Sequence, residues 1–153
     1  MAPSLIELPK FFDRRGNLSF IEEDNHLPFK IRRVYWIYDV PGGEIRGGHA
    51  FRETDELIVA LSGSFDVILH DGKEQVVFNL NRSYYGVLVP RMIWRSIENF
   101  STNSLALIIA FSGFLIFFLV NKIKKATSKM VAIVANRKKS REAFITAISS
   151  SCK

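Results

Sequence analysis

Residues in the middle of the chain have types and a spacing that suit proton transfer. His49 and Phe51 lie two residues apart in a stretch of strand-like composition, and Glu56 follows them. Side chains at positions i and i+2 of an extended strand point to the same face, so His49 and Phe51 are expected to project together. An imidazole titrates near neutral pH and suits general-base catalysis, although a buried histidine often serves only the core. The residues alone leave both roles of His49 open.

Further side chains of useful chemistry flank this stretch. Tyr35 lies in the preceding strand-like run, Arg46 comes just before Gly47 and Gly48, and Arg15 stands near the end of an early strand candidate. A Gly pair lets backbone come close to a ligand. Two arginines could clamp a diphosphate through forked hydrogen bonds, but exposed arginines are more often plain solvated surface.

The elements that must position these residues are short strands. Runs of β-branched and aromatic residues recur at regular spacing, separated by turn residues, and no helical period precedes residue 110. The pattern predicts an all-β fold, an antiparallel sandwich or barrel. The expected strands are residues 5–8, 18–22, 31–40, 46–51, 56–61, 65–69, 76–80, 84–90, 93–97 and 105–110.

The character of the chain changes after residue 110. Residues 1–120 hold 12 Lys or Arg and 14 Asp or Glu, whereas residues 121–153 hold 9 and 1. We therefore predict a barrel domain over residues 1–110 and a divergent tail over 111–153, apolar at first, then basic, and expected to be helical. The slightly acidic barrel does not have the clustered positive charge of a nucleic-acid binder, so no nucleic-acid partner is expected.

The tail has several interpretations. Its apolar run is shorter than the roughly 20 residues that a membrane-crossing helix needs, yet lysines follow it. Membrane attachment through residues 111–125, a packed helix or strand, and an altered reading frame therefore remain alternatives. The single Cys152 and an N-terminus without an export signal favour a reducing, cytoplasmic location, with membrane association as the minority alternative.

The stretch from Gly43 to Gly63 resembles the first sequence pattern of the cupin barrels, with Phe51 where a second His is expected. A second cupin pattern can be placed from Pro90, and Arg95 then stands where its His would fall. Cupins commonly hold a metal with these histidines and the Glu at position 56. A divalent metal needs three or four ligands, none of them cationic. We therefore expect neither a metal nor another cofactor.

Residues 10–110 also resemble the dTDP-4-keto-6-deoxyglucose 3,4-ketoisomerases of the cupin superfamily. A string of motifs in register carries the resemblance, over about two thirds of the chain. The matching stretches are residues 13–18, 20–23, 28–39, 46–50, 59–64, 69–73 and 86–95.

This resemblance implies a jelly-roll barrel, a homodimer and a dTDP-linked keto-deoxysugar as ligand. It makes His49 and Tyr35 catalytic, and it assigns substrate binding to Arg15, Arg46, Phe51 and Trp94. The implied reaction is 3,4-ketoisomerisation through an enediol, slowed because Phe51 replaces a family histidine. The alternative is a non-catalytic or decayed sugar-nucleotide-binding cupin, tethered to a membrane through its tail.

Overall fold

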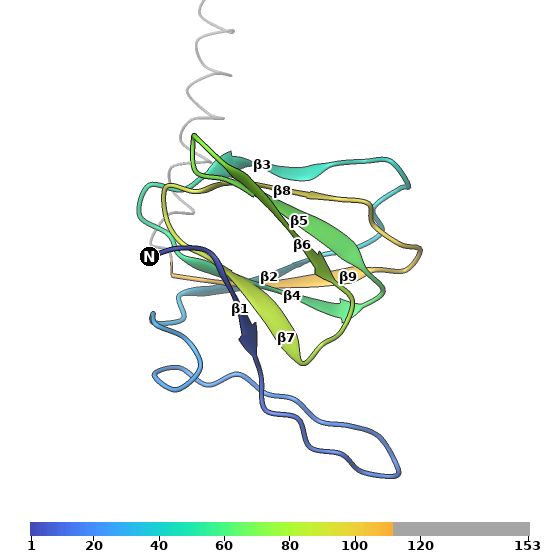
Figure 1. Cartoon of the computed structure of the whole chain (residues 1–153). Helices are drawn as coiled ribbons and strands as arrows, with labels where there is room; N and C mark the ends of the chain where they lie inside the picture. Colours follow the sequence, from blue (N-terminus) through green and yellow to red (C-terminus); the bar gives the residue numbers. More distant parts are fainter. Residues whose placement is uncertain (112–153) are drawn as a thin grey trace, which may run out of the picture. The chain divides into compact units, whose positions relative to one another are not determined.

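The computed structural model describes residues 1–111, which belong to one compact unit. Within this part of the chain, nine strands form two antiparallel sheets that face each other, as Figure 1 shows. The five-stranded sheet has the order β1-β7-β4-β9-β2, and the four-stranded sheet has the order β3-β8-β5-β6. β2 and β3 are therefore edge strands of different sheets.

The strand bounds follow the alternation of the sequence closely. They are β1 Ser4–Glu7, β2 Arg33–Ile37, β3 Arg46–Ala50, β4 Glu56–Ser62, β5 Phe65–His70, β6 Gln75–Leu80, β7 Tyr85–Val89, β8 Trp94–Glu98 and β9 Leu105–Ala110.

The core lies on both faces of the five-stranded sheet. Between the sheets, β4 contributes Ile58 and Ala60 to a buried cluster that includes residues of β5. On the other face, Leu57 and Val59 of β4 pack with the segment around residues 27–29. Because apolar side chains of β4 are covered on both faces, its first five residues are all buried.

The predicted all-β, antiparallel architecture is confirmed. In β2, Tyr35 is partly buried while Trp36 is exposed, as period-two alternation requires. The expected strand over 18–22 is wrong: there the structure has only an isolated bridge between Phe11 and Leu18. A strand needs a continuous partner, and the segment after β1 extends away from both sheets, so none lies beside it (Figure 1). The tail prediction concerns residues that, apart from Phe111, lie outside those described.

Gly86 in β7 offers a test of this packing. A Cβ at Gly86 would lie 2.7 Å from the Ile58 carbonyl oxygen and 2.7 Å from a methyl group of Val59. Gly86→Ala must push β7 away from β4, and we expect a loss of about 1–3 kcal/mol in the free energy of unfolding. Gly42→Ala, where a Cβ meets no atom within 4 Å, is the matched control. Urea denaturation of both variants checks the prediction, and equal stabilities would contradict it.

Candidate active site

A bulge in the edge strand β3 sets the direction of His49. β3 pairs with β8 so that Gly47 lies opposite Ser96 and His49 lies opposite Arg95, with the register shifting between the two pairs. Residues directly opposite each other in a sheet share a face. Because Arg95 is only 2% exposed, His49 also faces the interior between the sheets.

A buried ion pair joins the two sheets at this point. The Arg95 Nε donates to Glu56 Oε2 at 2.7 Å, and the Arg95 Nη2 donates to Glu56 Oε1 at 3.2 Å. The Tyr35 hydroxyl donates to the same Oε1 at 2.6 Å and accepts from Arg95 Nη2 at 3.0 Å. Glu56 and Tyr35 come from the five-stranded sheet and Arg95 from the four-stranded sheet, so this triad bridges the sandwich.

The backbone of β3 leaves room for this arginine. A Cβ at Gly47 would lie 2.4 Å from Arg95 Nη1, and Gly47 has a φ of +92°, a conformation that glycine adopts readily. The sequence suggested that a ligand could come close to the backbone at Gly47 and Gly48. At Gly47, the group that comes close is the Arg95 guanidinium.

The hydrogen bonding of His49 fixes its tautomer. The Nδ1 lies 2.9 Å from the Gly47 carbonyl oxygen, which can only accept, so Nδ1 carries the proton and donates. The opposite ring nitrogen, Nε2, therefore presents a lone pair. It is buried and has no hydrogen-bond partner. The ring packs edge-on against Phe51, with centroids 4.5 Å apart. The buried Nε2 therefore keeps a lone pair that can accept a proton.

The surroundings of the site shift the pKa values of His49 and Tyr35 in opposite directions. Burial lowers the pKa of His49, and the Arg95 charge lowers it further, against smaller opposite effects of the Gly47 carbonyl and Glu56. Burial raises the pKa of Tyr35 far above its ordinary value, with the Glu56 carboxylate adding to the effect. Burial opposes the charge of Arg95, but Glu56 outweighs it and raises the pKa. Near neutral pH, His49 and Tyr35 are therefore both uncharged.

Several of the residues predicted from the sequence meet here. Tyr35, His49 and Phe51 surround the Arg95 guanidinium, whose central carbon lies 5.9 Å from the centroid of the Phe51 ring. Arg46 lies opposite the buried Ile97, on the same face of β3 as His49, and its side chain is exposed.

The sequence analysis missed the roles of Glu56 and Arg95 in this site. It treated both only as remnants of a metal site. A signal for Arg95 was present, because the residue shares its strand parity with the apolar Ile93 and Ile97. An inward-facing arginine needs a carboxylate partner.

Two other predicted residues are not brought to this site. Arg15 lies in the extended N-terminal segment, where its side chain is 90% exposed and is ion-paired with Asp13 at 2.9 Å. Trp94 lies opposite Ala50, on the other face of the β3-β8 pair from Arg95, and is 50% exposed.

A divalent metal does not fit this arrangement of side chains. Among residues 1–111 no three His, Cys, Asp or Glu side chains are grouped so that they could hold a metal ion. Glu56, the ligand that the cupin pattern would supply, is instead bound to the Arg95 guanidinium.

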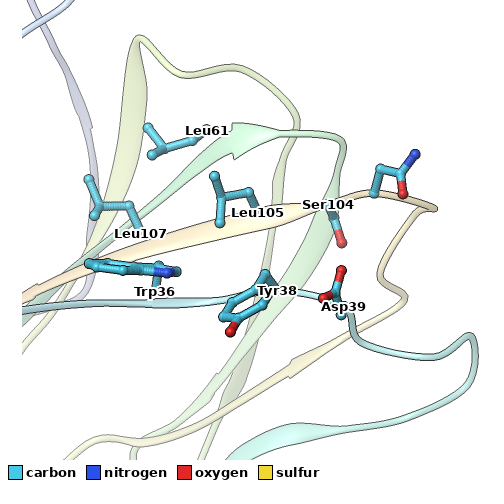
Figure 2. A pocket seen from close by; sticks show the side chains of 8 residues that line it. Trp36, Tyr38, Asp39, Leu61, Ser104, Leu105 and Leu107 are labelled. Atoms are coloured by element: carbon cyan, nitrogen blue, oxygen red, sulfur yellow. The ribbon is translucent and has the colours of Figure 1, made fainter.

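An apolar groove lies elsewhere, on the outer face of the five-stranded sheet. Figure 2 shows Leu105 and Leu107 of β9 in the middle of it, with Leu61 of β4 on one side and Trp36, Tyr38 and Asp39 on the other. Trp36, Tyr38 and Leu61 are 59%, 60% and 44% exposed, which is high for side chains of this size.

The described part of the chain contains no helix of the length and apolarity needed to cross a membrane.

Comparison with known proteins identifies several sugar 3,4-ketoisomerases as relatives. A curated TDP-4-oxo-6-deoxy-alpha-D-glucose-3,4-oxoisomerase from Aneurinibacillus thermoaerophilus is 36% identical over 110 residues, which are 72% of this chain and 79% of that protein. The 3,4-ketoisomerase of Helicobacter canadensis superposes with a TM-score of 0.72 at 31% identity, over 74% of this chain and 86% of that one.

A third relative has been crystallised with a nucleotide. The sugar 3,4-ketoisomerase QdtA from Thermoanaerobacterium thermosaccharolyticum, in complex with TDP, superposes with a TM-score of 0.71 at 28% identity, over 73% of this chain and 82% of that one. A mutant of the same enzyme, in which one histidine is replaced by asparagine, was crystallised with TDP-4-keto-6-deoxyglucose.

The fold and these relatives define the class as that of the antiparallel jelly-roll sugar ketoisomerases. Residues 1–115 match the family model FdtA, described as "WxcM-like, C-terminal", and the chain belongs to this family. The resemblance predicted from the sequence is thereby confirmed.

The lowered pKa of His49 predicts a pH dependence of stability. The folded state binds a proton at His49 less readily than the unfolded chain does, whose histidine pKa is about 6.5. The contribution of His49 to the stability of the folded state is therefore complete above the unfolded-state pKa. It is lost as the pH falls through the lower pKa of His49 in the folded state. We expect His49→Asn to lose less stability than the native protein between pH 7.5 and 5, measured by urea unfolding. His70→Asn, which removes an imidazole outside the site, is the control. An equal loss in native protein and His49→Asn would contradict the prediction.

Proposed function

We propose that this chain catalyses the 3,4-ketoisomerisation of a dTDP-4-keto-6-deoxyhexose. The observation that supports this most strongly is the unpartnered Nε2 of His49, a neutral base that faces the interior beside a fixed guanidinium. The relatives described above act on such sugars according to their names, and two of the crystal structures hold TDP or the keto-sugar nucleotide.

The reaction moves a carbonyl group from carbon 4 to carbon 3 through an enediol. His49 removes the proton from carbon 3, and the Arg95 guanidinium stabilises the negative charge that develops on the oxygen at carbon 4. His49 then returns a proton to carbon 4. A positioned base of this kind contributes about 10² to 10⁴ in rate. In this proposal the exposed Arg46, on the same face of β3 as His49, binds the diphosphate, and Phe51, whose ring packs against His49, contacts the sugar.

A non-catalytic sugar-nucleotide-binding protein is the second candidate. Phe51 has no ionisable group that could donate or accept a proton. Its ring packs edge-on against His49, at the position where the resemblance leads one to expect a second imidazole. In that case the barrel binds the nucleotide without turning it over. Attachment to a membrane through residues 111–125 is a further proposal, and it concerns residues that, apart from Phe111, lie beyond the described part of the chain.

Turnover distinguishes the two candidates. We expect the native protein to form the 3-keto product from dTDP-4-keto-6-deoxyglucose and to exchange the proton on carbon 3, both followed by proton NMR in deuterated water. His49→Asn should abolish both signals, because no other imidazole faces the site among residues 1–111. The binding-only alternative requires saturable dTDP binding with no product from either the native protein or Phe51→His, whereas an isomerase slowed by the loss of the second imidazole should gain about tenfold or more in turnover from Phe51→His.

The position of Arg15 supports a homodimer. The segment that carries Arg15 extends away from its own sandwich (Figure 1), so Arg15 does not lie beside its own His49. The same segment exposes Phe11, Phe12 and Leu18 by 58%, 72% and 57%. Exposed apolar side chains on a protruding segment are typical of a surface that binds a partner. We propose that the segment of one copy packs against a second copy and brings Arg15 to the diphosphate bound there.

Mixed dimers test the exchange of this segment. His49→Asn alone should be inactive, and Arg15→Ala alone should be at least tenfold slower at low substrate concentration, a difference of about 1.4 kcal/mol. Co-expression with two affinity tags isolates dimers that hold one copy of each. Such a dimer combines an intact His49 with an intact Arg15 from the other copy, so we expect it to regain activity. A mixed dimer as slow as Arg15→Ala would show that Arg15 acts on the diphosphate bound in its own copy, or does not act on the diphosphate at all.

A further inference from the structure

The hydrogen bonds of Tyr35 restrict what its hydroxyl group can do. A guanidinium group only donates, so the bond from Arg95 Nη2 at 3.0 Å uses one acceptor position of the phenol oxygen. The Tyr35 proton then points to Glu56 Oε1 at 2.6 Å. One acceptor position of the oxygen is left. Tyr35 can therefore take a proton from a ligand only if it passes its own proton to Glu56.

Ketoisomerisation needs such a transfer between oxygens. While His49 moves a proton from carbon 3 to carbon 4, the hydroxyl proton on oxygen 3 must leave and a proton must reach oxygen 4. Phe51 has no titratable group with which to share this work. The imidazole of His49 has its Nδ1 engaged with the Gly47 carbonyl, so one nitrogen remains for the carbon protons.

We propose that Glu56 is a positioning residue that makes Tyr35 the carrier of the oxygen-bound proton, in the role that a second imidazole would fill. This inference rests on the proposed function. The hydroxyl at carbon 3 gives its proton to the Tyr35 oxygen as the Tyr35 proton moves to Glu56. Glu56 then returns that proton to Tyr35, which donates one to the oxygen at carbon 4. No proton is gained or lost over the cycle, and neither an oxidant nor a reductant is needed.

The arrangement of the triad supports this role. The Tyr35–Glu56 hydrogen bond is short, and the Glu56 side chain is buried with 2% exposure. Arg95 holds both Glu56 oxygens in place through Nε and Nη2. Nη1 takes part in neither of these bonds and lies beside Gly47 of β3. The guanidinium thus fixes the carboxylate that accepts from Tyr35 through Nε and Nη2 alone.

Two substitutions separate the relay from mere support of the fold. Tyr35→Phe removes the carrier and keeps the Glu56–Arg95 ion pair. Glu56→Asp keeps the charge that Arg95 requires, but its carboxylate is one methylene shorter and no longer reaches the Tyr35 hydroxyl. Tyr85→Phe is the matched control, because Tyr85 donates an equally short bond of 2.6 Å to Asn81 at another place in the chain.

The readout is the ratio of two signals from one NMR experiment, proton exchange at carbon 3 and formation of the 3-keto product. Exchange needs only His49 and a stabilised enolate, whereas product formation also needs the oxygen-bound proton to move. We expect both variants to lose product formation at least tenfold while exchange at carbon 3 falls much less. The double variant should be no slower than the slower single variant, since the two residues act as a unit. Tyr85→Phe should keep both rates.

The same experiment distinguishes failure of this inference from failure of the proposed function. If the native protein shows neither exchange nor product, the proposed function and the inference fall together. If the native protein forms product and both variants keep its ratio of product to exchange, the inference alone is overturned and Glu56 has only a structural role. Should Glu56→Asp not fold, the dependence of the native rate on deuterium content decides: a curved dependence indicates two protons in motion, and a linear one overturns the relay.

Discussion

The ion pair between Glu56 and Arg95 is the constraint on which the rest of the site depends. Both side chains are almost fully buried, and they lie in different sheets. Removing two charges from water is unfavourable, and the pair is tolerated because four hydrogen bonds satisfy it, counting the two that Tyr35 makes with Glu56 and Arg95. Loss of one partner would strand the other charge in the interior at about 3–5 kcal/mol. The ion pair therefore fixes the position of the two sheets relative to each other at the site.

Gly47 and the bulge in β3 follow from the size of the arginine. Nη1 occupies the space where a Cβ at position 47 would lie, so the edge strand approaches β8 only with glycine there. The extra residue, Gly48, shifts the register so that His49 rather than Gly48 comes opposite Arg95. The orientation of His49 is thus a consequence of accommodating the buried cation.

The sequence predicted the strands well and the site in part. The strand-like composition of residues 105–110 located β9 to the residue, because it depends on local pattern. The same pattern misled at residues 18–22, where no partner strand lies alongside. The pairing of Glu56 with Arg95 could not be derived locally, because it depends on how β4 and β8 of different sheets come together. Strand parity with Ile93 and Ile97 could have placed Arg95 inside, but it could not have identified Glu56 as its partner.

The environment of each group also explains how one site can hold a base and a proton carrier at the same pH. A guanidinium stays charged at every accessible pH, so its effect on its neighbours is constant. Burial, with the Arg95 charge as the second cause, lowers the pKa of His49 and favours the unprotonated imidazole, while burial and the Glu56 carboxylate raise the pKa of Tyr35 and keep the phenol protonated. Groups whose pKa values are driven in opposite directions take different chemical roles. In this barrel burial and one buried ion pair together set the protonation states on which the proposed roles of His49 and Tyr35 depend.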